Sequence, residues 1–242
     1  MIDFALLIII ALVTWNVAAE GAWGAAALFL SVIFAGLIAM NFFEPLANFL
    51  EVNVSSDWSM RFDFISLMVL FVGAVFLLRL MSEKIAPGFI AVHSRLYDVC
   101  RFGFALMTGY VTAAFLLAAM HTAPLPREFL GFTPERKNFF GMTAPDREWL
   151  GFVQYVSEKS MQSSERGRIF DGFEFRFEVP VEGRDDLILT TYIIRYASRR
   201  EAYAAATGGT PAATPSGAAV APGGGEQAPA TLGGVRDRGS GL

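Results

Sequence analysis

Side chains that could carry out acid–base, nucleophilic or metal chemistry are few in this sequence and far apart. Its 242 residues include one cysteine, Cys100, and two histidines, His93 and His121. A single cysteine can form neither an internal disulfide nor a multi-thiolate metal site. The two histidines flank an apolar stretch, and we expect them to lie at its two ends. The sequence therefore predicts no metal site.

The hydroxyl and carboxyl groups further along the chain show no catalytic spacing either. Ser163, Ser164, Asp171 and the two acids at 185–186 match no nucleophile elbow, phosphate-binding loop or pair of catalytic acids. We interpret them as turn residues. No catalytic residue and no cofactor are expected, and the sequence predicts a protein that is not an enzyme.

A second set of candidates consists of polar residues within or beside long apolar stretches. They are Asp3, Asn16, Glu20, Asp63 and Arg79. An ionisable residue inside a membrane marks an ion or proton pathway by default. Here the charged members all fall at the ends of apolar stretches, where they can reach headgroups or water, and Asn16 lies one turn from an end. We therefore interpret them as boundary residues.

The overall composition points to a membrane protein. Hydrophobic residues make up 54% of the chain and charged residues 17%, whereas soluble domains average about 25% charged residues. The first 60 residues hold no lysine or arginine. The formal charge is −4, with no basic cluster that could form a nucleic-acid surface. The partner expected first is the lipid bilayer, and no nucleic acid is expected.

Four apolar windows are long enough to cross a hydrocarbon core about 30 Å thick. Glu20-Gly21 separates the first two windows, and a single helix through both would reach about twice the core thickness, so a helical hairpin is favoured. The first window begins with Asp3 and no basic residue, which argues against a cleaved signal peptide. The predicted transmembrane domain covers 1–121, with spans at about 2–19, 21–43, 62–81 and 102–121.

The two longer connectors carry further signals. In 44–61, Pro45 is expected to end or kink the second helix. In 82–101, apolar residues recur at helical spacing after Pro87-Gly88, which predicts an amphipathic surface segment running into the fourth span. Connector 82–101 also holds more lysine and arginine than 44–61. The positive-inside rule therefore places 82–101 in the cytoplasm and both termini outside.

Residues 122–201 are more polar and predict a small soluble α+β unit. Pro145 opens a helix expected to reach Gln162. Strict alternation over 173–179 predicts a strand, and 187–196 is expected to pair with it. A unit this small is marginal alone, so we expect it to pack on the membrane domain or on another subunit. Residues 202–242 are rich in Ala, Gly and Pro and predict a disordered tail.

Small residues recur on one face of two of the predicted spans. In lipid, such stripes let helix backbones approach closely. We expect a packing seam within the bundle or between subunits; the alternative is that alanine is simply common here. The helix-packing candidates are Ala27, Ser31, Ala35 and Ala39 in the second span, and Gly103, Gly109 and Ala113 in the fourth.

Residues 1–121 resemble the colicin V production protein (CvpA) family in layout and in a few motif residues. The similarity covers an early acid, Asp3; the glycine Gly21 in a short first turn; the longer second loop; and Arg95 followed by Gly103 and Gly109 at the start of the last span. The family's Arg-Gly turn is Glu20-Gly21 in this chain, and the Asp that precedes its arginine is replaced by Ser94.

The resemblance implies an α-helical, multi-pass protein of the bacterial inner membrane, linked to colicin V production or secretion or to envelope homeostasis. It implies assembly as a homo-oligomer or with other membrane proteins, and it carries over no catalytic residue. Two alternatives stay open. A channel or transport-accessory subunit needs a polar stripe, for which only Thr108 and Thr112 line up. A membrane-anchored binding module needs residues 132–200 to fold and bind alone.

Overall fold

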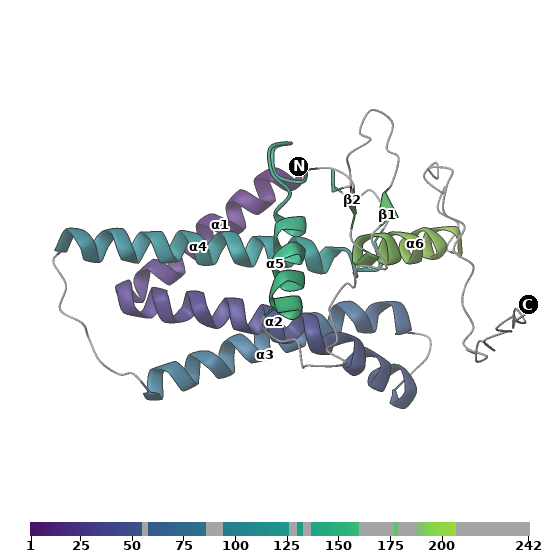
Figure 1. Ribbon diagram of the computed structural model, residues 1–242, viewed down its shortest axis with the longest axis horizontal. Helices are drawn as coiled ribbons and strands as arrows, with labels where there is room; N and C mark the ends of the chain where they lie inside the picture. The colour runs from purple at the N-terminus through teal and green to yellow at the C-terminus, as the bar shows by residue number, and fades with distance from the viewer. Residues whose placement is uncertain are drawn as a thin grey trace, which may run out of the picture.

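The computed structural model describes residues 1–54, 58–85, 94–125, 130–132, 137–159, 177–178, 188–189 and 191–206. Six helices and one pair of short strands are found in these residues (Figure 1). In chain order they are α1 (Ile2–Ala19), α2 (Gly21–Asn53), α3 (Ser59–Ile85), α4 (Ser94–Met120), α5 (Pro145–Lys159), β1 (Phe177–Glu178), β2 (Ile188–Leu189) and α6 (Thr191–Ala206).

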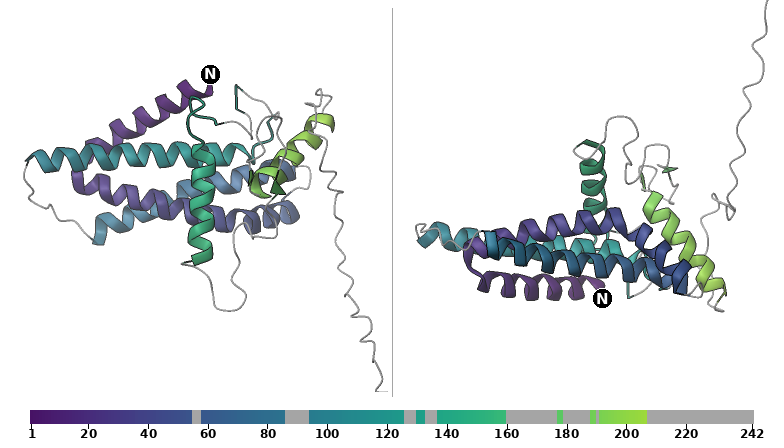
Figure 2. Two further views of the ribbon diagram at one scale, coloured as in Figure 1. Left: turned by 45° about the horizontal axis from the view of Figure 1, so that its top comes forward. Right: turned by 90° about the horizontal axis from the view of Figure 1, so that it is seen from below.

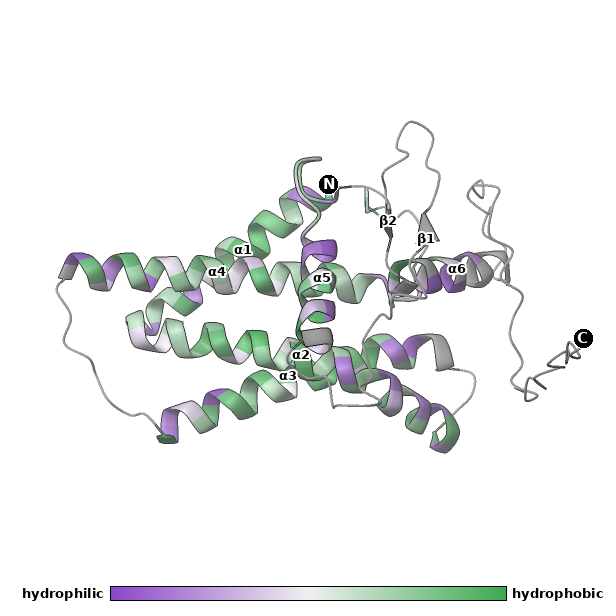
Figure 3. Cartoon of the chain, in the orientation of Figure 1, coloured by the Kyte–Doolittle hydropathy of each residue, from purple (hydrophilic) through white to green (hydrophobic). Residues whose placement is uncertain are grey.

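Four of these helices are long and apolar enough to cross a membrane, which confirms the expected four apolar helices. They are Ile2–Ala19, Gly21–Asn53, Arg61–Ile85 and Ser94–Met120. α2 packs most extensively on α3, α1 packs on α4, and α2 also contacts α4. Figure 3 shows hydrophobic residues along most of these helices and hydrophilic residues toward their ends.

The turn between α1 and α2 depends on its glycine. Gly21 has a φ of +83°, a left-handed conformation that side chains with a Cβ rarely adopt. A Cβ at Gly21 would also lie 2.5 Å from the Tyr97 hydroxyl. The chain therefore reverses after Glu20, and two antiparallel helices form instead of one, as the sequence predicts.

The second helix does not end at Pro45, where the sequence predicted an end or a kink. α2 continues for eight residues past this proline, to Asn53. Proline lacks the amide that would bond to the carbonyl of Asn41, but the buried side chains Phe43 and Ala47 hold the helix in the bundle on either side of it. Burial therefore outweighs the local cost of proline.

The amphipathic segment before the fourth span is continuous with that span. α4 begins at Ser94, so Leu96 and Val99 lie on the same helix as the apolar residues that follow. Residues 86–93, which include Pro87-Gly88 and His93, lie outside the described residues.

The α+β unit expected over 122–201 is not supported by the described residues. Strand structure there consists of β1 and β2, which pair antiparallel with Phe177 opposite Leu189. The strand expected over 187–196 is wrong beyond Leu189, because α6 starts at Thr191. Tyr192, Ile193 and Tyr196 are buried, and this i, i+1, i+4 spacing forms a helical face that the β-branched residues obscured.

The ends of this region can be compared with expectation only in part. α5 begins at Pro145 as predicted and is described as far as Lys159, so the expected end at Gln162 lies outside the described residues. α6 runs to Ala206, so the tail expected from residue 202 begins with helix. The segments 160–176, 179–187 and 207–242 lie outside the described residues, as do most of the alternating residues of 173–179.

The core joins the C-terminal helices to the membrane bundle. Phe71 of α3 stacks on Phe115 of α4 with ring centroids 3.9 Å apart, and Trp149 of α5 contacts Phe115 edge-on at 6.0 Å. Tyr192 and Tyr196 of α6 belong to the same buried cluster. α5 and α6 are thus packed onto the bundle and do not form a core of their own.

Candidate functional site

Polar side chains gather at both ends of the apolar bundle, and each group joins segments that are distant in sequence. The hairpin-end cluster consists of Glu20, Arg79 and Glu83. The C-terminal cluster consists of Glu44, Asp63, His121, Asp146, Arg195 and Arg199.

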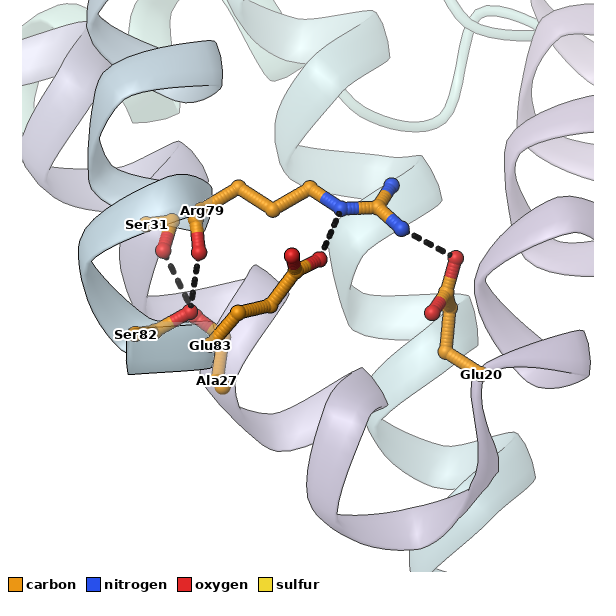
Figure 4. Close-up of polar contacts among 6 residues, drawn as sticks. All are labelled: Glu20, Ala27, Ser31, Arg79, Ser82 and Glu83. Atoms are coloured by element: carbon orange, nitrogen blue, oxygen red, sulfur yellow. Dashed lines mark hydrogen bonds and ion pairs between the residues drawn. The ribbon is translucent and has the colours of Figure 1, made fainter. Parts of the chain in front are cut away.

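In the hairpin-end cluster, one arginine of α3 bridges two acids (Figure 4). Nη2 of Arg79 lies 2.6 Å from Oε1 of Glu20, and its Nε lies 3.0 Å from Oε1 of Glu83. The three side chains line an open cavity of about 80 Å³ together with Trp23 and Ser82. Arg79 is 41% exposed and Glu20 39%. Such exposed pairs contribute about 0–1 kcal/mol, so the cluster positions the α1–α2 turn against α3 more than it stabilises the fold.

A second arginine links two helices at the hairpin end of the bundle. The Arg101 guanidinium of α4 donates a hydrogen bond to the carbonyl oxygen of Ala18. This carbonyl belongs to the last turn of α1, where backbone acceptors lack intrahelical partners. Arg101 therefore caps α1 and ties it to α4.

The C-terminal cluster holds the most deeply buried ionisable pair of the described residues. His121 follows α4 and Asp146 lies in the first turn of α5. His121 Nε2 and Asp146 Oδ2 are 3.0 Å apart, and both side chains are 0% exposed. Phe132 contacts the imidazole edge-on at 5.0 Å, and Tyr192 lies at 6.3 Å. The pair therefore fastens the start of α5 to the end of α4.

Two arginines of α6 pair with acids of the α2–α3 hairpin. Arg195 Nη2 lies 2.5 Å from Glu44 Oε1, and Arg199 Nη1 lies 2.5 Å from Asp63 Oδ2. Asp63 is the more buried acid, at 10% exposure. α6 thus supplies partners for two carboxylates, each at the end of an apolar stretch. Without these partners the carboxylates would face a low-dielectric surface unpaired.

Tyrosines add a third type of contact between α6 and the bundle. The Tyr192 hydroxyl donates to the carbonyl oxygen of Ala118 at 3.2 Å, and Phe43 of α2 contacts Tyr192 edge-on at 6.3 Å. Burial raises the pKa of Tyr192 well above its usual range and also raises that of Tyr196. Tyr192 therefore stays protonated and keeps its donor hydrogen at any physiological pH.

The small residues of the second span line the interior of the bundle. Ala35 and Ala39 are 0% exposed and Ser31 is 6% exposed, whereas Ala27 is half-buried. The Ser31 hydroxyl donates to the carbonyl oxygen of Ala27 at 2.8 Å (Figure 4), so it is satisfied within its own helix. The stripe thus lies within one chain, where α2 packs on its neighbours.

The glycines of the fourth span differ from one another. A Cβ at Gly109 would lie 2.8 Å from the carbonyl oxygen of Ile10 in α1, and Ala113 is 2% exposed in the same α1–α4 contact. Gly103 is exposed, and a Cβ there would meet nothing within 4 Å. Gly109 and Ala113 therefore lie in a helix seam, and Gly103 lies outside it.

This difference gives a matched pair of substitutions. Gly109→Ala is expected to lower the stability of the bundle relative to Gly103→Ala by about 1–3 kcal/mol, because α1 must move to admit the methyl group. The gain in helix propensity, about 1 kcal/mol, is common to both variants. Thermal unfolding in detergent, followed by circular dichroism, measures the difference. Equal melting temperatures would mean that α1 and α4 do not approach this closely.

The three residues matched to the family motif do not form one site. Asp3 lies at the start of α1, where its Oδ1 accepts a hydrogen bond from the Phe140 amide at 2.6 Å. Gly21 and Arg95 lie toward the other end of the bundle, Gly21 against Tyr97 and Arg95 exposed in the first turn of α4. Asp3 positions a turn, and Gly21 permits one.

Sequence reasoning missed the His121–Asp146 pair. His121 lies directly after α4, at the end of the apolar stretch as expected, but it is fully buried. The partners lie 25 positions apart, and the segment between them carries no periodic signal, since the contact depends on where α5 crosses the bundle. The paired arginines of α6 were also missed, because 187–196 was interpreted as a strand. In the described part of the chain, no three His, Cys, Asp or Glu side chains are grouped as a metal site would require.

These features define a class: a multi-pass α-helical membrane protein whose polar clusters fasten helices together at both ends of the bundle. Residues 2–136 match the family described as colicin V production protein. The match covers more than half of the chain, and the protein belongs to this family. No curated protein and no solved structure matches the chain.

Proposed function

We propose that this protein acts in the bacterial inner membrane as a non-catalytic assembly component for the production or export of a colicin V-type toxin. The observation that carries the proposal is the family match over residues 2–136. The predicted orientation, with connector 82–101 in the cytoplasm, is part of this proposal. It would place α5 and α6 on the outer side of the membrane.

The outer surface of the bundle supports action by assembly. Large apolar side chains point outward from all four long helices, among them Trp15 at 80%, Phe34 at 52%, Phe76 at 63% and Leu106 at 56% exposure. Lipid and the apolar faces of other membrane helices both fit such surfaces. A second copy of this chain or another membrane protein is the expected partner.

The described residues do not favour a pore. Thr108 and Thr112 were the only aligned polar residues of the fourth span, and their hydroxyls bond back to the carbonyl oxygens of Phe104 and Thr108 at 2.7 Å each. They are thus satisfied within α4 and offer no polar lining. A free-standing binding module over 132–200 is also disfavoured, because Trp149, Val153 and Tyr192 are buried against bundle helices.

The proposal is tested by removing the protein from a colicin V-producing strain and measuring toxin activity in the culture medium with an indicator lawn. We expect extracellular activity to fall to background, and plasmid-borne wild-type protein or the Gly103→Ala variant to restore it. Membrane fractionation of the same cells should recover the protein with the inner membrane. Unchanged extracellular activity in the deletion strain would contradict the proposed role.

A further inference from the structure

α5 runs across the bundle, not along it. In Figure 1 and in the left view of Figure 2 its axis runs at a steep angle to α4 and α2, and in the right view α5 projects from one side of the bundle. One face of α5 is buried against the bundle, through Trp149, Leu150 and Val153. The opposite face carries Tyr155 at 62% exposure, and Phe152, at 39%, lies at the edge of the buried face with its ring centroid 5.6 Å from that of Trp149. α5 is therefore an amphipathic helix with an aromatic side chain on its outward face.

Two contacts fix the level at which α5 crosses. Trp149 lies against Gly36 of α2 and contacts Phe115 of α4. From the hairpin end, Gly21 to Gly36 and Arg101 to Phe115 each span about 21–23 Å of α-helix. In a hydrocarbon core about 30 Å thick, this level lies about 8 Å inside the opposite boundary. In-plane amphipathic helices bind at about 5–10 Å into the headgroup–acyl boundary.

The turn before α5 exposes apolar side chains beside it. Phe139 and Thr143 form an isolated bridge, and between them Phe140 is 42% and Met142 68% exposed. Phe4 of α1, itself 67% exposed, contacts Phe140 edge-on at 6.0 Å. The apolar surface of α1 thus continues without a break onto this turn.

We propose that α5 and the turn 139–143 form an in-plane belt that binds the headgroup–acyl boundary of the bilayer. The belt's depth and its continuity with the surface of α1 favour lipid as the occupant. Tyrosine suits this level, because its ring is apolar and its hydroxyl reaches water. The acid on the exposed face, Glu148, accepts a hydrogen bond from the Tyr110 hydroxyl at 2.5 Å, so its carboxylate has a partner at this depth.

The proposal goes beyond the toxin-related function and does not depend on it. It revises the expectation that residues 122–201 form a soluble unit. A membrane-bound α5 also explains how one helix can bury Trp149 on one side while exposing Tyr155 on the other and part of Phe152 at the edge between them. In water these aromatic rings would add to an exposed apolar surface, which soluble proteins keep small.

Spin labels test the belt in the full chain. In a Cys100→Ser background, single cysteines at Tyr155 and Met142 are labelled, and the protein is reconstituted into phosphatidylcholine–phosphatidylglycerol vesicles. Collision rates with oxygen, which concentrates in lipid, and with a water-soluble nickel chelate are then compared. Val72, exposed near the middle of α3, and Ser94, exposed at the start of α4, provide the lipid and water references.

We expect labels at Tyr155 and Met142 to collide more with oxygen than with the chelate, at a depth nearer the boundary than Val72. Chelate accessibility equal to that of Ser94 would overturn the proposal, because α5 would then face water. Shielding from both reagents would also overturn it, since a protein partner or a second copy would then cover the belt. If Tyr155→Cys does not fold, Phe152→Cys takes its place as the α5 position.

Discussion

Asp146→Ala is expected to lower the free energy of unfolding by about 1–3 kcal/mol, the cost of leaving a buried polar group without its hydrogen-bond partner. Asp146 and His121 are both 0% exposed and 3.0 Å apart. Removing the carboxylate leaves the imidazole nitrogen buried without its acceptor. It also releases the first turn of α5 from α4, so packing around Trp149 is expected to weaken as well.

The measurement is chemical or thermal unfolding in detergent micelles, with Glu148→Ala as the matched control. Glu148 is also an acid in the first turn of α5, so it shares the favourable interaction with the helix dipole. It is exposed, as is the hydrogen bond that it accepts from the Tyr110 hydroxyl. We expect that variant to lose about 1 kcal/mol or less. The double variant Asp146→Ala, His121→Ala should lose less than the sum of the single variants. Similar small losses for Asp146→Ala and Glu148→Ala would show that the pair is not buried.

The four apolar helices could be predicted from sequence because the physical signal is local. A run of about 20 apolar residues specifies a span whatever surrounds it, and Gly21 marks the first reversal because the left-handed backbone of the turn is a local feature that favours glycine. The extension of α2 past Pro45 was missed for the converse reason. A local rule predicted that the helix would end or kink at Pro45, and burial of Phe43 and Ala47 on either side kept it helical past this residue.

The polar clusters could not be predicted because they depend on contacts between distant segments. Asp63 and Arg199 are separated by 136 residues, and each alone is a typical boundary residue. Their pairing requires α6 to lie against the α2–α3 hairpin. The same residues that suggested a β-strand, Tyr192 and Ile193 among them, form the face of α6 that makes this contact. The β propensity of these residues favoured a strand, but their burial against the bundle selected a helix.

Helix packing explains why the small residues of this chain differ in importance. Gly36 was not among the expected packing residues, since it falls outside the four-residue repeat of Ala35 and Ala39. It nevertheless has the most restricted environment of the three, because the indole ring of Trp149 occupies the space that a side chain would need. The position of α5 on the bundle thus depends on the absence of a side chain in α2.

Gly36→Ala is therefore expected to destabilise the protein relative to Gly73→Ala by about 1–3 kcal/mol. A Cβ at Gly36 would approach Cη2 of Trp149 to 2.7 Å, whereas a Cβ at Gly73 of α3 would meet nothing within 4 Å. Both substitutions gain similar helix propensity, so the difference reports the contact with Trp149. Thermal unfolding in detergent compares the two variants.

The substitution Trp149→Phe tests whether the contact with Trp149 causes the destabilisation expected for Gly36→Ala. The atoms nearest to Gly36, Cζ2 and Cη2, belong to the six-membered ring of the indole, and a phenylalanine ring does not extend as far. In the double variant Gly36→Ala, Trp149→Phe, the alanine should therefore cost less than it does beside tryptophan, and the coupling between the two sites should be favourable. If the stability changes of the two substitutions were strictly additive, the cost of Gly36→Ala would not come from the contact with Trp149. α5 would then not pack on α2 at this glycine.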